Sequence, residues 1–263
     1  MRAYRALISA RFRMLLQYRA AAIGGIGTQL FFGLAMIMAY EAFYRSSSAA
    51  QPMSYRDIVT YVWLGQAFLA MLPWNVDADL RALIRSGAVA YEMLRPMDLY
   101  WAWYCRALAL RIAPTLLRAI PVVTLAMLFL GMHLPPTPAS AAAWALGMLG
   151  SLFLGCAFTM LMNISLLWTI SGEGITTLIP ALVLVCSGMN IPLPLFPAWA
   201  QRILYWLPFR GLIDVPFRLY LGEIPPGEAG PLFLQQMAWT AALILAGRWL
   251  LSRGKRRLIV QGG

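Results

Sequence analysis

Long apolar runs, most of them close to the length that crosses a lipid bilayer, dominate this chain of 263 residues. A helix needs about 20 apolar residues to cross roughly 30 Å of hydrocarbon. The chain is 61% hydrophobic and only 12% charged, which is more apolar than a soluble core of this size needs. We therefore expect an all-α, polytopic membrane protein. Six transmembrane helices are predicted, at residues 21–40, 58–76, 108–132, 141–170, 175–189 and 232–251.

Lysine and arginine are divided unequally between the two sides that these spans define. Short cytoplasmic loops carry an excess of Lys and Arg. Most basic residues lie before the first span, between the second and third spans and at the C-terminal end, which predicts that both termini are cytoplasmic. The opposite side holds a minority: Arg45, Arg56, Arg202, Arg210 and Arg218. Residues 191–210 must not cross the membrane, because a seventh crossing would put the basic C-terminal end outside.

The types of residue present also exclude several classes of function. The formal net charge of +11 suits anionic lipid head groups, because the basic residues cluster at the edges of apolar runs; membrane lipids and no nucleic acid are therefore expected as partners. The single histidine, His133, lies in an outer loop without other metal ligands. No GxxxxGK[ST] loop is present to hold the phosphates of ATP. We expect no catalytic residue, no metal and no cofactor bound by this chain.

The first 20 residues precede a full-length span and do not have the form of a cleavable signal peptide. Polar residues recur every three or four positions, at Arg2, Arg5, Ser9, Arg13 and Gln17. This period predicts an amphipathic helix at residues 1–20 that lies in the cytoplasmic interface with its guanidinium groups toward lipid phosphates. A plain topology anchor is the simpler interpretation and is compatible with it.

Residues 191–210 are broken by prolines and rich in the aromatic rings that prefer the head-group boundary. We interpret this segment as a re-entrant helical hairpin that dips into the outer leaflet and returns; an amphipathic loop on the surface is the alternative. Non-helical backbone at that depth must be buried in protein or line a wet cavity. The residues expected to form this hairpin and an outer gate are Pro192, Pro194, Phe196, Pro197, Trp199, Trp206 and Pro208.

The connection between the second and third spans contains a second amphipathic helix, predicted at residues 79–95. Asp77 and Asp79 suit the positive end of a helix, and Pro96 stops its continuation. Such a helix, held off the membrane, is a docking surface, whereas the alternative is a solvated connector with ordinary charges. The residues expected to dock are Asp79, Arg81, Arg85, Tyr91, Glu92 and Arg95.

Arg118 is the best candidate for a charged residue within the membrane, because it lies in the third span between Pro114 and Pro121. Buried ions are costly there and often functional. One interpretation places Arg118 on the substrate path, against an anionic group of the cargo. The other has it extending to the cytoplasmic interface beside Arg111.

Three stretches give the chain a specific resemblance. They are IRSGAVAYEMLRPMD at residues 84–98, the segment from SGMNIPLP to FRLYLG at residues 187–222, and the ending KRRLIVQGG at residues 255–263. In this order and spacing the chain resembles the permeases of type-2 ABC exporters, and in particular a bacterial branch whose members often end in Gln-Gly-Gly.

The resemblance implies a subunit of the bacterial plasma (inner) membrane. Residues 79–95 would be the coupling helix that inserts into a cytoplasmic ABC ATPase dimer, and ATP and Mg²⁺ would bind to that partner. A second permease subunit, identical or different, would complete the translocation path. Residues 21–251 would form the transmembrane domain and residues 252–263 a basic cytoplasmic tail. Gly24, Gly25, Gly27 and Gly33, or alternatively Gly147, Gly150 and Gly155, would permit close helix approach at the dimer seam.

Composition does not name the cargo. The abundant methionine and tryptophan suit a hydrophobic or amphiphilic compound such as a drug, and multidrug efflux is the expected role. An ABC-type lipid or glycolipid flippase subunit is the alternative. A secondary transporter is ranked lower, because no acidic residue lies in the middle of a predicted span.

Overall fold

The computed structural model describes residues 2–17, 19–47, 50–168 and 173–261, and within these ranges every regular element is a helix. Four helices are long and apolar enough to cross a membrane: α2 (Arg19–Ser46), α6 (Leu99–Phe129), α7 (Pro138–Ser165) and α11 (Ala229–Gln261). This confirms the prediction of a helical, polytopic membrane protein. The count of six spans stays a prediction, because α3 (Tyr55–Phe68) and α8 (Glu173–Cys186) have only 14 residues each.

The second predicted span is wrong as a continuous helix over residues 58–76. Helix α3 passes into the short 3₁₀ helix η1 (Leu69–Met71) and ends there, and residues 72–77 have no helical structure. Pro73 has no N–H to continue the helical ladder. The helix itself is enclosed on all sides, since every residue from Ile58 to Ala67 is buried.

Helix α6 is longer than expected, starting at Leu99 although residues 108–132 were predicted. The Asp98 carboxylate caps this start by accepting the N–H of Trp101 at 3.0 Å. The added turns bury Tyr100, Trp103 and Tyr104 against α7 and α11, in a hydrophobic cluster separate from the main core around α3.

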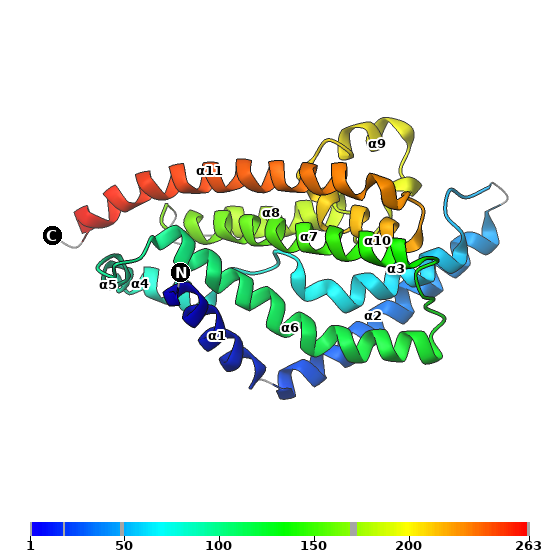
Figure 1. Ribbon diagram of the computed structural model, residues 1–263, viewed down its shortest axis with the longest axis horizontal. Coiled ribbons are helices and arrows are strands. Elements are labelled where there is room, and N and C mark those ends of the chain that lie inside the picture. Colours follow the sequence, from blue (N-terminus) through cyan, green and yellow to red (C-terminus); the bar gives the residue numbers. More distant parts are fainter. Residues whose placement is uncertain (1, 18, 48–49, 169–172, 262–263) are drawn as a thin grey trace.

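Figure 1 shows that the molecule has two distinct ends. The first, called here the α4 end, holds the N-terminus, the short helices α4 (Ala78–Arg85) and α5 (Val89–Met93), and the C-terminus. The other, called the α9 end, holds α9 (Ala198–Leu204), α10 (Asp214–Leu221) and the C-terminal end of α2. The arginines that the sequence assigns to the side opposite the termini lie at the α9 end: Arg45, Arg56, Arg202, Arg210 and Arg218.

Helix α1 (Arg2–Leu16) forms as predicted from the polar period of residues 1–20. It has no fully buried residue and packs along α6. The Tyr4 hydroxyl accepts the N–H of Asp98 at 3.1 Å, which fixes α1 beside the start of α6. Its location in a membrane interface stays a prediction.

Residues 191–210 form a compact series of short helices in place of a two-helix hairpin: η2 (Leu193–Leu195), α9 and η3 (Pro208–Leu212). Four prolines prevent longer helices here. The Gln201 side chain holds the turn by donating to the carbonyls of Pro194 and Phe196, at 3.0 and 2.7 Å. The residues from 252 onward, predicted as a basic cytoplasmic tail, continue α11 as far as Gln261, and their cytoplasmic location stays a prediction.

Glycines predicted for a dimer seam are partly used inside the chain. A Cβ on Gly33 would lie 2.5 Å from the Trp63 ring of α3, and one on Gly25 would lie 2.7 Å from the Arg118 guanidinium of α6. Gly24 and Gly27 have open space around them. The close approach at Gly25 and Gly33 therefore packs α2 against α6 and α3 of the same chain.

Candidate coupling site

The segment predicted as one docking helix, residues 79–95, is two short helices separated by a turn. Gly87 has a φ of +73° between α4 and α5, a conformation that favours glycine and ends the first helix. The prediction of a single continuous helix is therefore wrong, while the amphipathic character of both pieces remains.

Asp77 caps α4. Its Oδ1 accepts the N–H groups of Asp79 and Leu80, at 3.0 and 3.2 Å, which satisfies two donors that the helix leaves unpaired. The N–H of Asp77 itself donates to Oδ1 of Asn163 in α7 at 3.1 Å. The start of α4 is thus attached directly to α7, the most buried of the four long helices.

Two arginines from different helices share the buried Asp77 carboxylate. Arg106 of α6 donates from Nε to Oδ2 at 3.0 Å, and Arg11 of α1 reaches Oδ1 at 3.2 Å. Burial acts to raise the pKa of Asp77, but the Arg106 hydrogen bond and charge, the Arg11 charge and the Leu80 N–H outweigh it, so the pKa is lowered. Arg11 also pairs with Asp79.

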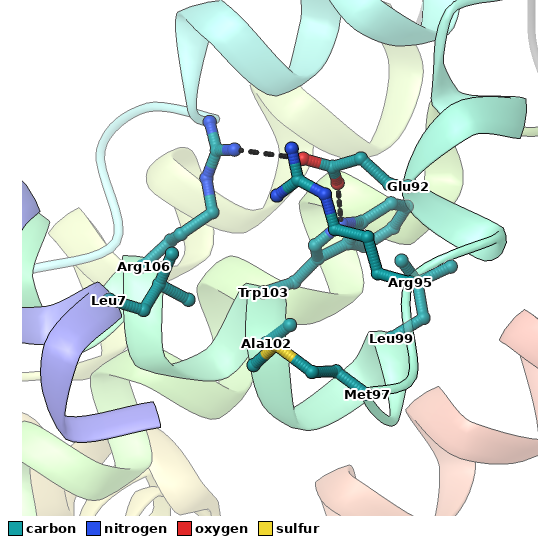
Figure 2. Close-up of a pocket in the computed structure, with 8 residues that line it drawn as sticks. All are labelled: Leu7, Glu92, Arg95, Met97, Leu99, Ala102, Trp103 and Arg106. Atoms are coloured by element: carbon teal, nitrogen blue, oxygen red, sulfur yellow. Dashed lines mark hydrogen bonds and ion pairs between the residues drawn. The ribbon is translucent and has the colours of Figure 1, made fainter. Parts of the chain in front are cut away.

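Helix α5 is attached to the same network through Glu92, as Figure 2 shows. The Glu92 carboxylate accepts Nε1–H of Trp103 at 2.8 Å and pairs with Arg106 at 3.3 Å. Leu7 of α1 and Arg95 also line the small cavity in this view, whose volume is about 30 Å³. That volume suits water and excludes a cofactor or cargo molecule.

Apolar contacts support the same two helices. Leu80 of α4 and Val89 of α5 are almost completely buried, in a cluster with Tyr100 and Trp103 of α6 and Met160 of α7. Ion pairs and core packing together hold five helices in contact at this end of the molecule: α1, α4, α5, α6 and α7.

The opposite surface of α4 and α5 is exposed and carries both apolar and basic groups. Tyr91 is 74% exposed and Leu94 80%, and the exposed Arg85 and Arg95 lie in the same two-helix segment. We call these four residues the docking face. Large exposed apolar side chains beside cations are typical of a surface that meets a protein partner.

The structure thus separates the six residues expected to dock. Arg85 and Tyr91 lie on the docking face, and Arg95 is exposed there but also lines the small cavity beside Glu92. Glu92 itself points inward to Arg106, and Asp79 pairs with Arg11. Arg81 lines a separate cleft with Trp74 and Thr176. Sequence reasoning recognised Asp77 only as a helix cap and missed its pairing with Arg11 and Arg106, since no local pattern signals partners 66 and 29 positions away.

Arg111 stabilises the non-helical segment that leads into α4. Its buried guanidinium donates to the carbonyls of Leu72 and Asn75 and to the Thr159 hydroxyl, at 3.0 Å for Asn75 and 2.9 Å for Thr159. Backbone carbonyls that leave a helix inside a bundle need such donors. Arg111, which the sequence assigns to the basic residues of the cytoplasmic side, is therefore buried and has a structural role.

Arg118 of α6, the predicted substrate-path residue, is half-buried and faces α2. Its guanidinium packs against Gly25, and its Nε has no hydrogen-bond partner among the described residues. Contact with cargo stays a prediction.

The predicted gate residues all lie at the α9 end but in different surroundings. Trp199 and Trp206 are highly exposed, at 69% and 78%, while Pro192 and Pro208 are buried. Phe196 and Pro194 are half-buried and Pro197 is exposed. The Tyr40 hydroxyl of α2 donates to the Asn190 carbonyl at 2.6 Å, which joins this segment to the first long helix.

Acidic residues at the α9 end are also paired. His133 lies 3.1 Å from Asp57, and the buried Asp214 lies 3.5 Å from Arg210 and 3.7 Å from Arg218. Among the described residues no group of three His, Cys, Asp or Glu side chains is placed to hold a metal ion.

Comparison with known proteins identifies the family. The family model described as ABC-2 family transporter protein matches residues 30–262, which begin within α2 and include all but the last residue of the chain beyond it. No curated protein and no solved structure gave a match. The chain therefore belongs to the ABC-2 transporter family, whose members are membrane subunits of ABC transporters that act with an ATPase subunit.

Proposed function

We propose that this chain is the permease subunit of an ATP-driven exporter of the bacterial inner membrane, with the docking face as its contact with the ATPase. One observation carries this proposal: the segment of α4 and α5 has both an exposed face and a buried face. The buried face is bonded to three other helices, and the exposed face consists of Tyr91, Leu94, Arg85 and Arg95. A docking element must have both, because a partner's movement has to be transmitted to the bundle.

The transmission follows from the contacts. Closure of an ATPase dimer on bound ATP and Mg²⁺ would push α4 and α5. Asp77 and Glu92 would pass the displacement to Arg106 of α6 and Arg11 of α1, because buried ion pairs resist separation. The bundle would then shift between inward-open and outward-open states.

The same proposal includes the orientation of the chain in the membrane and its second permease subunit. The basic α4 end faces the cytoplasm, six spans cross the membrane, and the α9 end closes the outer side of the path. A second permease, identical or different, completes that path. The exposed face of α2, with Gly24, Gly27, Phe31 and Met38, supports a dimer seam there. The cargo is hydrophobic or amphiphilic.

Charge reversal of the docking face tests the proposal. The double variant Arg85→Glu, Arg95→Glu is expected to lose co-purification with the ATPase and substrate-stimulated ATP hydrolysis. The matched control is Arg56→Glu, Arg202→Glu, which makes the same charge change on exposed arginines at the α9 end. Equal assembly and equal ATP hydrolysis for the two double variants would show that the docking face has no such role.

A further inference from the structure

A second cleft lies beside the coupling site, where the chain leaves η1 and enters α4. Trp74, Asn75 and Val76 of the non-helical segment form one wall, Ala78 and Arg81 of α4 a second, and Thr176 of α8 a third. Its volume is about 420 Å³, which is within the range of about 300–1,000 Å³ that is usual for ligand pockets.

The electrostatics of this cleft favour an anion. Arg81 is its one charged lining residue among the described side chains, and no described carboxylate pairs with it. The Arg81 Nε is buried and has no hydrogen-bond partner among the described residues. The half-buried Arg81 thus lines the cleft with a guanidinium charge that no described carboxylate neutralises, and such a charge favours an anionic ligand oxygen.

The nearest carboxylate along the chain does not neutralise Arg81. Asp77 is already shared by Arg106 and Arg11, and Asp79 pairs with Arg11. Behind the wall, Arg111 binds the carbonyls of Leu72 and Asn75, so its positive charge lies close to the same segment. Among the described side chains, the positive charge at this position therefore exceeds what the neighbouring carboxylates balance.

The remaining lining is suited to a hydrocarbon chain. Trp74 and Val76 are half-buried and present apolar surface, and the Trp74 Nε1–H is already used by the Leu69 carbonyl at 2.8 Å. The wall is also non-helical backbone inside a membrane protein, which is tolerated where it lines a cavity.

We infer that this cleft receives an exported amphiphile with an anionic head group, which Arg81 binds while Trp74 and Val76 contact the apolar chain. The inference rests on the proposed function and names its substrate class. Arg81 and the docking-face residue Arg85 are one turn apart on α4, so movement of α4 by the ATPase would change the cleft directly.

The probe is 11-(dansylamino)undecanoate, a fluorescent carboxylate with an alkyl chain, compared with its uncharged methyl ester. Both are titrated against the permease–ATPase complex in phosphatidylcholine nanodiscs. Arg81→Gln is expected to weaken binding of the carboxylate about tenfold, equivalent to about 1.4 kcal/mol, and to leave the ester unchanged. Each probe also partitions into the lipid of the nanodisc, but this partition is the same for every variant and therefore cancels when variants are compared.

Three further measurements complete the test. Arg5→Gln, which removes an exposed charge from α1, is expected to leave both affinities unchanged. Ala78→Trp, which fills the cleft, is expected to weaken both probes. Inorganic phosphate is expected not to displace the carboxylate probe, because it lacks the apolar chain. Displacement by phosphate would show that the cleft binds small anions only, and it would overturn the inference that the ligand is an amphiphile.

Failure of this inference can be distinguished from failure of the proposed function. An Arg81→Gln complex that still co-purifies with its ATPase but keeps the wild-type ratio of carboxylate to ester affinity would overturn this inference and leave the docking role intact. If Arg81→Gln does not assemble, Ala78→Trp decides: affinities for the two probes that fall no more in Ala78→Trp than in Arg5→Gln would equally overturn the inference.

Discussion

The Arg106 guanidinium of α6 lies 3.0 Å from the carboxylate of Asp77, the residue that caps α4. The same carboxylate holds Arg11 of α1, and the backbone of Asp77 holds Asn163 of α7. One aspartate thus connects the coupling segment to three other helices. Because this connection is internal, its loss can be distinguished from loss of docking.

Asp77→Asn is the variant that isolates this connection. Asparagine remains a good helix cap, but it removes the charge that both arginines share. We expect the ATPase to co-purify as with the wild type, while substrate stimulation of ATP hydrolysis falls several-fold. Asp79→Asn is the control, since Asp79 is largely exposed and pairs with Arg11 alone. Equal stimulation in the two variants would contradict a transmitting role for Asp77.

The lowered pKa of Asp77 predicts a pH dependence of stability. A carboxyl whose pKa is lower in the folded than in the unfolded chain stabilises the fold above its ordinary value of 3.8, and this stabilisation is lost as the pH falls through the lowered value. The difference in Tm between wild type and Asp77→Asn should be constant above about pH 5 and shrink below about pH 4. Thermal unfolding in detergent over a pH series that extends beyond both limits measures this difference in Tm, and a difference that grows on acidification would have the wrong sign.

The sequence predicted what depends on local pattern. Apolar length identified α2, α6, α7 and α11, and the acidic start and Pro96 placed the coupling segment within a few residues. It did not predict that α3 would stop at η1, because the residue that satisfies the exposed carbonyls, Arg111, lies about 40 positions further on. Likewise, the outward Arg85 and the inward Glu92 are both charged residues of one amphipathic segment, and only tertiary pairing with Arg106 separates them.

Arg111→Met tests whether the end of α3 depends on that arginine. The substitution keeps a long side chain but leaves the Asn75 carbonyl without its donor, at a cost of about 1–3 kcal/mol, and leaves the Leu72 carbonyl with the N–H of Trp74 alone. We expect a marked loss of thermal stability in detergent. Arg118→Met, about two turns further along α6, is the control; its Nε has no partner among the described residues, so its loss should cost much less. Similar losses in both variants would argue against a special role for Arg111.

Orientation is tested by single cysteines at the two ends. Trp199→Cys on α9 should react with a membrane-impermeant maleimide added outside, and Leu94→Cys on the docking face only after the cells are opened. Both wild-type residues are highly exposed, so access is limited by sidedness. Labelling of the unaltered chain corrects for its three native cysteines. Reaction of Trp199→Cys from the cytoplasm would overturn the six-span topology.

The contact between α2 and α3 requires glycine at position 33. The first methyl group of any side chain there would lie 2.5 Å from the Trp63 ring. That ring is fully buried, and its Nε1–H is bonded to the Leu130 carbonyl at 3.1 Å, so it cannot move aside. Gly33→Ala should therefore lower the free energy of unfolding by about 1–3 kcal/mol. Gly230→Ala in α11, with nothing within 4 Å of the added methyl group, should cause no loss. Comparison of the two thermal unfolding midpoints in detergent decides the matter, since equal midpoints would mean that α2 does not pack this closely on α3.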